Sequence, residues 1–437
     1  MNSGVERVRQ DDTRPRERGP RSAHAVGRRR RSCAEHSTAV ALAVVVSLSS
    51  APSFAQTEER VGIPVGEANA YPAIRIDYLA NDNVFVQPDD AVSGSSVVVS
   101  PSVELVADRR QLTLRGSYAG EFSQGSENVL DHADHTLTLD VDAEVDKRRR
   151  PSAFVSYRRD HQEIGFDLTR GLAVGLNEPV VFDQFDVGAR FRYGVVDARG
   201  NVEGGLLYRA RRYANQERFT DGRDFNFIRP YGLFSYRLSG DTRAIVEVRY
   251  EAVARSDQRN DRGELSVFGG VEFAATGRFR GEARIGATRA SYDDEAREDV
   301  TLLAASADLS YLLREYATLT LTLDRELDDS AIQELNDGTG EQAITDTIRF
   351  GWLHEWSSRV SHEAFVERSS VTQLCPDRDT TTIEGGLDLN VELRRWLSFG
   401  ATAAAKSRDA EDCAGGEDEI SLDYERRLFG AYVRVTL

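Results

Sequence analysis

The chain has 437 residues, of which 40% are hydrophobic and 29% charged, and its formal net charge is −17 at pH 7. No segment beyond the N-terminal region reaches the roughly 18 consecutive apolar residues that a membrane-spanning helix requires, which excludes a helical membrane protein. A transmembrane β-barrel is not excluded, because its strands alternate apolar and polar residues and average out as polar.

Residues 1–55 are predicted to be a secretory signal peptide. Four arginines at 28–31 precede an apolar stretch that begins at Ala39, and small residues lead up to Ala55. This order of basic, apolar and small residues is typical of a cleaved leader, and the apolar part is too short to span a membrane. The alternative is a disordered basic tail that binds nucleic acid, which the apolar run directly after the arginines disfavours.

The predicted mature chain is more acidic than the whole sequence. The leader carries ten Arg and five Asp or Glu, so its removal shifts the net charge from −17 to −22, and nucleic acid is not expected as a partner. Cys33 leaves with the leader and lies before the apolar run, so a lipid anchor is not expected. Cys375 and Cys413 remain, either as a disulfide in an oxidising compartment or as two unpaired thiols.

The mature chain is predicted to contain a short periplasmic segment, residues 56–70, followed by one repeating domain, residues 71–437. This domain repeats segments of roughly 10 to 14 residues with period-two alternation. The short breaks between segments fall near residues 108–110, 146–150, 197–200, 239–242, 276–278, 314–316, 357–359 and 394–396. The longer polar breaks fall near residues 87–96, 124–134, 162–181, 214–224, 257–262, 293–299, 328–344, 372–379 and 409–418.

These breaks predict an all-β fold, a transmembrane antiparallel up-and-down β-barrel of about 18 strands, within a range of about 16 to 20. Alternating short turns and long loops are the hairpin repeat of outer-membrane barrels. An even number of strands puts both termini on the short-turn side, which faces the periplasm in bacterial barrels. The chain is therefore expected in the bacterial outer membrane.

Strand length distinguishes this barrel from a soluble β-sandwich or solenoid. Strands of soluble sheets average about five or six residues, whereas a tilted strand needs roughly 9 to 11 to cross a bilayer. In residues 244–255 one face carries Val246, Val248 and Tyr250, and the opposite face carries Glu247 and Glu251. Such alternation over twice the usual length favours the membrane barrel.

Two further features support a barrel. Phe279, Tyr316, Trp356 and Trp396 lie where strands meet short turns, at the level of an interfacial aromatic girdle, although aromatic residues also favour strands in general. The final residues are apolar at every second position up to Leu437, which resembles the terminal strand recognised by barrel-assembly machinery, although that strand usually ends in Phe.

The mature sequence gives no indication of an enzyme. It has no helix-borne metal signature, phosphate-binding glycine loop or nucleophile elbow, and no feature pairs a histidine with a particular serine. We therefore predict no catalytic residues and no cofactor.

Two polar features could bind cations. His132 and His135, beside Asp131 and Asp134, could bind a divalent metal, but nothing nearby in the sequence completes a site. The favoured interpretation is a solvated loop without metal. Acidic runs in the long breaks, such as residues 293–299, could bind Ca²⁺ or join cation-bridged lipopolysaccharide, but such runs are more often only solvated loop tips.

The polar faces of the strands predict the lining of the lumen. A charged side chain such as Arg facing lipid near the midplane would cost about 2–4 kcal/mol, so the charged faces must point inward. The wall either contacts hydrated solutes such as sugars or pairs its charges for rigidity, and the two roles are compatible. The candidate lumen residues are Asp140, Asp142, Glu144, Asp186, Arg190, Arg192, Glu247, Arg249, Glu251, Arg255, Arg280, Glu282, Arg284, Glu384, Asp388 and Glu392.

The start of the mature chain resembles one outer-membrane family. It contains Gly62-Ile63-Pro64-Val65-Gly66, then Tyr71-Pro72, and then Asn81-Asp82-Asn83-Val84-Phe85. These motifs resemble the "IPVG…YP" entry and "DDNVF"-like loop of the putative β-barrel porin 2 family, with Asn81 in place of the first Asp. The resemblance implies an outer-membrane barrel, similar to the EpsL-type proteins that accompany exopolysaccharide synthesis.

The resemblance implies export of an extracellular polysaccharide, with a periplasmic polysaccharide-export protein and the synthesis machinery as partners. Barrels of about 16 to 18 strands leave an aqueous channel, which agrees with transport. One alternative is a structural or adhesive barrel that binds partners through its large loops, particularly 162–181 and 328–344. The other is a general diffusion porin.

Overall fold

The computed structural model describes residues 62–162, 176–195, 198–240, 242–256, 261–293, 298–329, 342–374, 377–412 and 423–437. The predicted signal peptide, Cys375 and Cys413 lie outside the described residues. Within these ranges, no helix is long and apolar enough to cross a membrane. The two helical elements are a single turn each, η1 (Asn128–Leu130) and α1 (Glu217–Thr220).

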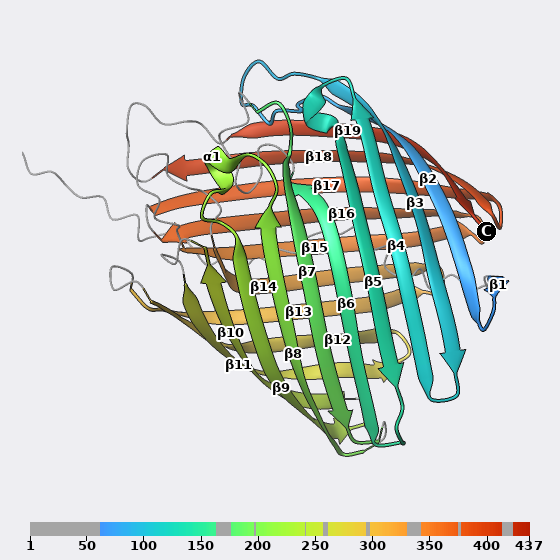
Figure 1. The fold of residues 1–437 in the computed structure, drawn as a ribbon, viewed down its shortest axis with the longest axis vertical. Helices are drawn as coiled ribbons and strands as arrows, with labels where there is room; N and C mark the ends of the chain where they lie inside the picture. Colours follow the sequence, from blue (N-terminus) through green and yellow to red (C-terminus); the bar gives the residue numbers. More distant parts are fainter. Residues whose placement is uncertain are drawn as a thin grey trace, which may run out of the picture. The chain divides into compact units, whose positions relative to one another are not determined.

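The described residues form a closed, antiparallel 18-strand β-barrel, which confirms the predicted fold class and strand number (Figure 1). Each strand pairs with the next along the chain, and β19 closes the ring on β2, with Val433 opposite Ile76. A short strand, β1 (Ile63–Val65), extends β2 as a hairpin around Gly66, whose φ is +64°. The strands of the ring are β2 (Ala68–Asn81), β3 (Gly94–Arg109), β4 (Leu112–Gly125), β5 (His132–Ala143), β6 (Arg149–Gln162), β7 (Val180–Tyr193), β8 (Gly200–Tyr213), β9 (Phe225–Ser239), β10 (Thr242–Arg255), β11 (Arg262–Thr276), β12 (Phe279–Tyr292), β13 (Val300–Arg314), β14 (Ala317–Asp329), β15 (Gln342–Ser357), β16 (Val360–Leu374), β17 (Asp377–Arg394), β18 (Leu397–Asp412) and β19 (Tyr424–Thr436).

The connections define two ends of the barrel. The predicted short breaks are the turns β3–β4, β5–β6 and so on to β17–β18, and we call this the turn end. The other connections lie at the loop end. Both ends of the ring lie at the turn end, as predicted, and the Leu437 amide donates to the Pro72 carbonyl there at 3.0 Å.

Local hydrogen bonds form the β5–β6 turn. The Asp146 carboxylate accepts hydrogen bonds from the Arg148 and Arg149 amides and from Arg149 Nε, the last at 2.7 Å. These donors hold the pKa of the Asp146 carboxyl below its usual value. These contacts stabilise the turn that follows Ala143, the last residue of β5.

One predicted loop was wrong. Residues 372–379 read as a long polar break, but β16 continues to Leu374 and β17 begins at Asp377. Their ladder includes Thr372 opposite Asp379 and Val371 opposite Thr380. Polar residues continue the hydrogen-bonded pairing because these strand ends lie beyond the apolar belt.

The outer surface of the barrel is apolar. On β10, Val246, Val248 and Tyr250 are about half exposed, whereas Glu247 and Glu251 are only 7% exposed. This distribution is the reverse of a soluble protein, in which apolar residues are inside and charges outside. The barrel therefore presents its apolar faces to lipid and its charged faces to the lumen.

Two bands of exposed aromatic residues border the apolar surface. On β7, Phe185 and Tyr193 belong to opposite bands and are separated by about 26 Å of strand, which suits a tilted strand crossing an apolar layer about 25 Å thick. Of the predicted girdle residues, Phe279 is half-buried and the others are exposed. The loop-end band includes Tyr78, Phe122, Tyr157, Phe185, Tyr208 and Tyr250, and the turn-end band includes Tyr193, Tyr236, Tyr311, Tyr316, Trp356 and Trp396.

Two apolar clusters lie toward the loop end. Val84 and Phe85 of the β2–β3 loop pack with Val129 and Leu130 of η1 and with Leu176, which fastens three loops together. The second cluster, on β11 to β14, consists of Phe268, Ala290, Leu302 and Ala304, which occupy inward positions, and of Leu327. The inner wall is therefore not polar throughout, which the alternation pattern did not predict.

Candidate functional site

The candidate site is the inner wall of the barrel, because most of the charged residues named from the sequence lie there. Those on strands alternate with the exposed apolar residues of the same strands, so they point inward: Asp140, Asp142, Asp186, Arg190, Arg192, Glu247, Arg249, Glu251, Arg255, Arg280, Glu282, Arg284, Glu384, Asp388 and Glu392. Glu144 is different, because β5 ends at Ala143 and places it in the β5–β6 turn. Its amide donates to the Gln111 carbonyl at 2.8 Å, and its place in the lumen stays a prediction.

Glu251 is the centre of a network of buried ion pairs on β9, β10 and β11. Arg229 Nε donates to Glu251 Oε2 at 2.6 Å, and Arg262 lies 3.5 Å from Glu251 Oε1. Arg262 also lies 3.6 Å from Glu264. The side chains of Glu251 and Arg262 are only 9% and 7% exposed. Each charge has lost most of its hydration and therefore needs the opposite charge beside it.

The neighbouring inner residues of β7 and β8 form a second network. Arg209 Nε donates to Asp186 at 2.6 Å, and Gln184 Nε2 donates to the same carboxylate at 2.9 Å. Arg211 donates to Gln184 Oε1 at 2.7 Å. The side chain of Gln184 is fully buried, so this network is part of the wall and does not extend freely into the lumen.

Further pairs continue around the ring. Arg284 pairs with both Glu247 and Glu282, and Lys406 Nζ lies 2.9 Å from Glu384. Together with the networks above, these pairs place both signs of charge on the wall. The described part of the wall offers many donors and acceptors, with positive and negative groups side by side.

Four inward aromatic rings lie against glycines of the adjacent strand. The register places each ring opposite its glycine, and a Cβ built on any of the four glycines would lie between 2.0 and 2.4 Å from a ring atom. Only glycine therefore lets these rings lie flat on the wall, where they occupy less of the lumen. The pairs are Phe154 with Gly188, Tyr231 with Gly205, Phe365 with Gly386 and Tyr432 with Gly400.

Polar groups lie beside two of these rings. The guanidinium carbon of Arg75 lies 3.8 Å from the ring centroid of Tyr432, and that of Arg349 lies 3.9 Å from the centroid of Phe365. The Tyr432 hydroxyl donates to Asp388 at 3.3 Å. The wall thus combines flat apolar ring faces with hydrogen-bonding groups beside them.

Replacing Gly400 with alanine is expected to destabilise the barrel by about 1–3 kcal/mol, because the added methyl would overlap the Tyr432 ring. The matched control is Gly116→Ala on β4, where a Cβ meets nothing within 4 Å. Urea unfolding of the barrel in lipid vesicles measures both. Equal stabilities of the two variants would contradict the ring–glycine contact.

The histidines named from the sequence are not brought together. His132 faces the inside with Asp134, whereas His135 faces the outside, where Tyr118 Oη lies 3.1 Å from His135 Nδ1. Phe122 packs edge-on against the His135 ring at 5.4 Å. One strand cannot direct residues separated by an odd number of positions to the same face, so this pair was wrongly grouped.

Comparisons with known proteins agree with a porin-type barrel. The family model described as "Putative beta-barrel porin 2" matches residues 57–370. A comparison with curated proteins found no match. The similar solved structures have low sequence identity to this chain and show only a general likeness to it.

Three of these structures come from Pseudomonas aeruginosa. OpdQ is 10% identical, with 85% of this chain and 98% of that chain covered and a TM-score of 0.47. OccK3 (OpdO) is 12% identical, with 85% and 96% covered and a TM-score of 0.45. A mutant of the ferric enterobactin receptor PfeA is 9% identical, with 84% and 80% covered and a TM-score of 0.45.

Proposed function

Because this chain belongs to the putative beta-barrel porin 2 family, which places it among bacterial outer-membrane barrels, we propose that its lumen is the conduit for an extracellular polysaccharide. The conduit works by steric passage and hydrogen bonding, and it uses no cofactor. The resemblance of the N-terminal sequence motifs to this family implies a likeness to EpsL-type proteins, which accompany exopolysaccharide synthesis, and this implied likeness motivates the choice of substrate.

The observation that carries the proposal is the composition of the inner wall. A sugar chain presents many hydroxyl donors and acceptors, together with apolar ring faces. The paired Arg and carboxylate side chains match the hydroxyls, and the flat rings of Phe154, Tyr231, Phe365 and Tyr432 match the ring faces. Because the charges already neutralise one another, they contact a passing polymer without holding it tightly.

The proposal includes partners at both ends of the barrel. A periplasmic polysaccharide-export protein would deliver the polymer at the turn end, where both ends of the ring lie. Outer-membrane lipid and lipopolysaccharide would surround the apolar belt between the two aromatic bands.

Single-channel recording in planar bilayers tests the conduit. We expect a stable conductance, and we expect fragments of the cell's own polysaccharide to interrupt the current. Phe154→Ala, which removes an inner ring, should shorten these interruptions several-fold, whereas Phe185→Ala on the lipid face should leave them unchanged.

Other outcomes of this recording would favour one of the two alternative functions. Absence of conductance would contradict any channel and favour a structural or adhesive barrel. Conductance without interruption by the polymer fragments, together with unchanged surface polysaccharide after gene deletion, would favour a general diffusion porin.

A further inference from the structure

Two histidines and one aspartate meet on β5 and β6 at the loop end of the barrel. His132 is the first residue of β5, Asp134 lies on the same strand, and His161 is near the end of β6. Their side chains are 11%, 15% and 15% exposed, so they are largely enclosed by protein. None of them takes part in the networks described above.

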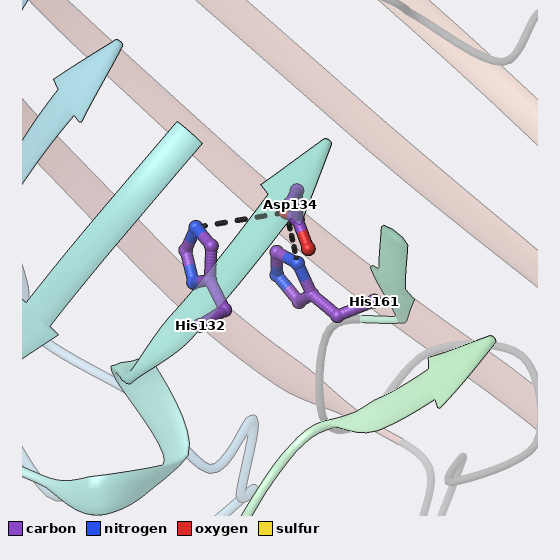
Figure 2. A group of neighbouring side chains, drawn as sticks. All are labelled: His132, Asp134 and His161. Carbon is purple, nitrogen blue, oxygen red and sulfur yellow. Dashed lines mark hydrogen bonds and ion pairs between the residues drawn. The ribbon is translucent and has the colours of Figure 1, made fainter. Parts of the chain in front are cut away.

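The donor atoms of these three residues converge (Figure 2). Asp134 Oδ2 lies 2.7 Å from His161 Nδ1 and 3.9 Å from His132 Nε2, and one ligand atom from each residue lies within 4.8 Å of the others. Ligands bound to one Zn²⁺ at about 2.0–2.2 Å lie roughly 3–3.5 Å from each other. The three atoms thus need only small movements to share a metal ion.

His161 contacts Asp134 just past the end of the β5–β6 ladder. The pairing of these strands ends with His135 opposite Arg159, whereas β6 remains paired with β7 further on, with His161 opposite Val181. The two imidazole rings stack with their centroids 3.9 Å apart.

The adjacent strand β4 supplies two more polar groups. Glu121 is opposite Asp134 in the ladder, and its Oε1 lies 3.1 Å from His132 Nε2. Ser123 is opposite His132, and its Oγ is buried without a hydrogen-bond partner among the residues that the structure describes. In the described part of the chain, the ion-pair partners of Asp134 and Glu121 are these histidines, so a cation would neutralise both carboxylates.

We propose that His132, Asp134 and His161 bind a divalent transition-metal ion of the Zn²⁺ class at the loop end of the barrel wall. Two imidazole nitrogens and one carboxylate oxygen form a ligand set that suits Zn²⁺ better than Ca²⁺ or Mg²⁺, which prefer oxygen alone. Glu121 Oε1, which lies 3.1 Å from His132 Nε2, is close enough to complete the coordination as a fourth ligand. The ion would tie β5 to β6 where their ladder has ended.

Isothermal titration of the purified, folded chain in detergent with Zn²⁺, after treatment with a chelator, tests this site. We expect one Zn²⁺ per chain, and a loss of affinity of about 100-fold or more in His161→Ala and in Asp134→Asn. The matched control is His135→Ala, which lies one residue from Asp134 on the outer face and should bind as the wild type does. X-ray absorption of the Zn²⁺-loaded chain should show two imidazole ligands.

Two further variants keep the test decisive. His354 and His362 stack at 5.6 Å near the turn end, so their joint replacement by alanine must leave the Zn²⁺ stoichiometry unchanged. A heat-modifiable band on unboiled gels confirms folding, and His161→Gln replaces His161→Ala if the latter does not fold. Absence of Zn²⁺ binding in the wild type, or unchanged binding in folded variants at positions 134 and 161, would overturn the proposal.

Discussion

Replacing Leu139 with arginine is expected to destabilise the folded barrel by about 2–4 kcal/mol, because the new charge would face the centre of the bilayer. Leu139 lies in the middle of β5 and is 52% exposed on the outer face. In a soluble protein such an exposed position would accept arginine at little cost, within about 0.5 kcal/mol. The size of the loss therefore reports that lipid, not water, surrounds this face.

The adjacent residue provides the control. Thr138 points to the inside, where its hydroxyl lies 3.1 Å from that of Ser156. Thr138→Arg is expected to cost about 1 kcal/mol or less, since the guanidinium extends into a polar lumen. Urea unfolding of barrels refolded into lipid vesicles compares the two, and a larger loss for Thr138→Arg would reverse the assignment of the faces.

Replacing Glu251 with alanine is expected to cost about 3–5 kcal/mol, the usual effect of removing one partner from a buried ion pair. Two arginines, Arg229 and Arg262, would lose the carboxylate that they share. The loss is large because the Glu251 and Arg262 side chains are less than a tenth exposed.

A more exposed pair serves as the comparison. Arg115 and Glu104 lie 3.1 Å apart with side chains 43% and 39% exposed, so Arg115→Ala should cost only about 1 kcal/mol or less. The same unfolding measurement applies to both variants. A small effect of Glu251→Ala would mean that the buried ion pairs of Glu251 contribute little to the free energy of unfolding.

The sequence predicted the fold because a membrane barrel repeats its pattern many times. Most strands alternate as Val246, Glu247 and Val248 do, and pairs of strands end in recognisable breaks. The strand number followed from these breaks, and β19 closes on β2 as a ring of that number requires. The one loop misjudged, at 372–379, is polar because its residues extend beyond the lipid, where polarity no longer distinguishes a strand from a loop.

The details of the site depend on register, which alternation alone does not determine. Phe154 and Gly188 are far apart in the sequence, and only the pairing of β6 with β7 places the ring on the glycine. Likewise, His161 joins His132 and Asp134 only where the β5–β6 ladder ends. Glycines at inward positions of long strands were the one available signal for the flat rings.

Polymer release by cells in which the lumen can be blocked on demand tests the conduit most directly. The cells carry Thr138→Cys on the inner face or, as control, Leu139→Cys on the outer face, with Cys375 and Cys413 replaced by serine in both. Both are treated with a maleimide bearing a polyethylene glycol chain. We predict that labelling stops release of the extracellular polysaccharide in Thr138→Cys cells and not in Leu139→Cys cells. Continued release from cells fully labelled at position 138 would contradict the proposed conduit.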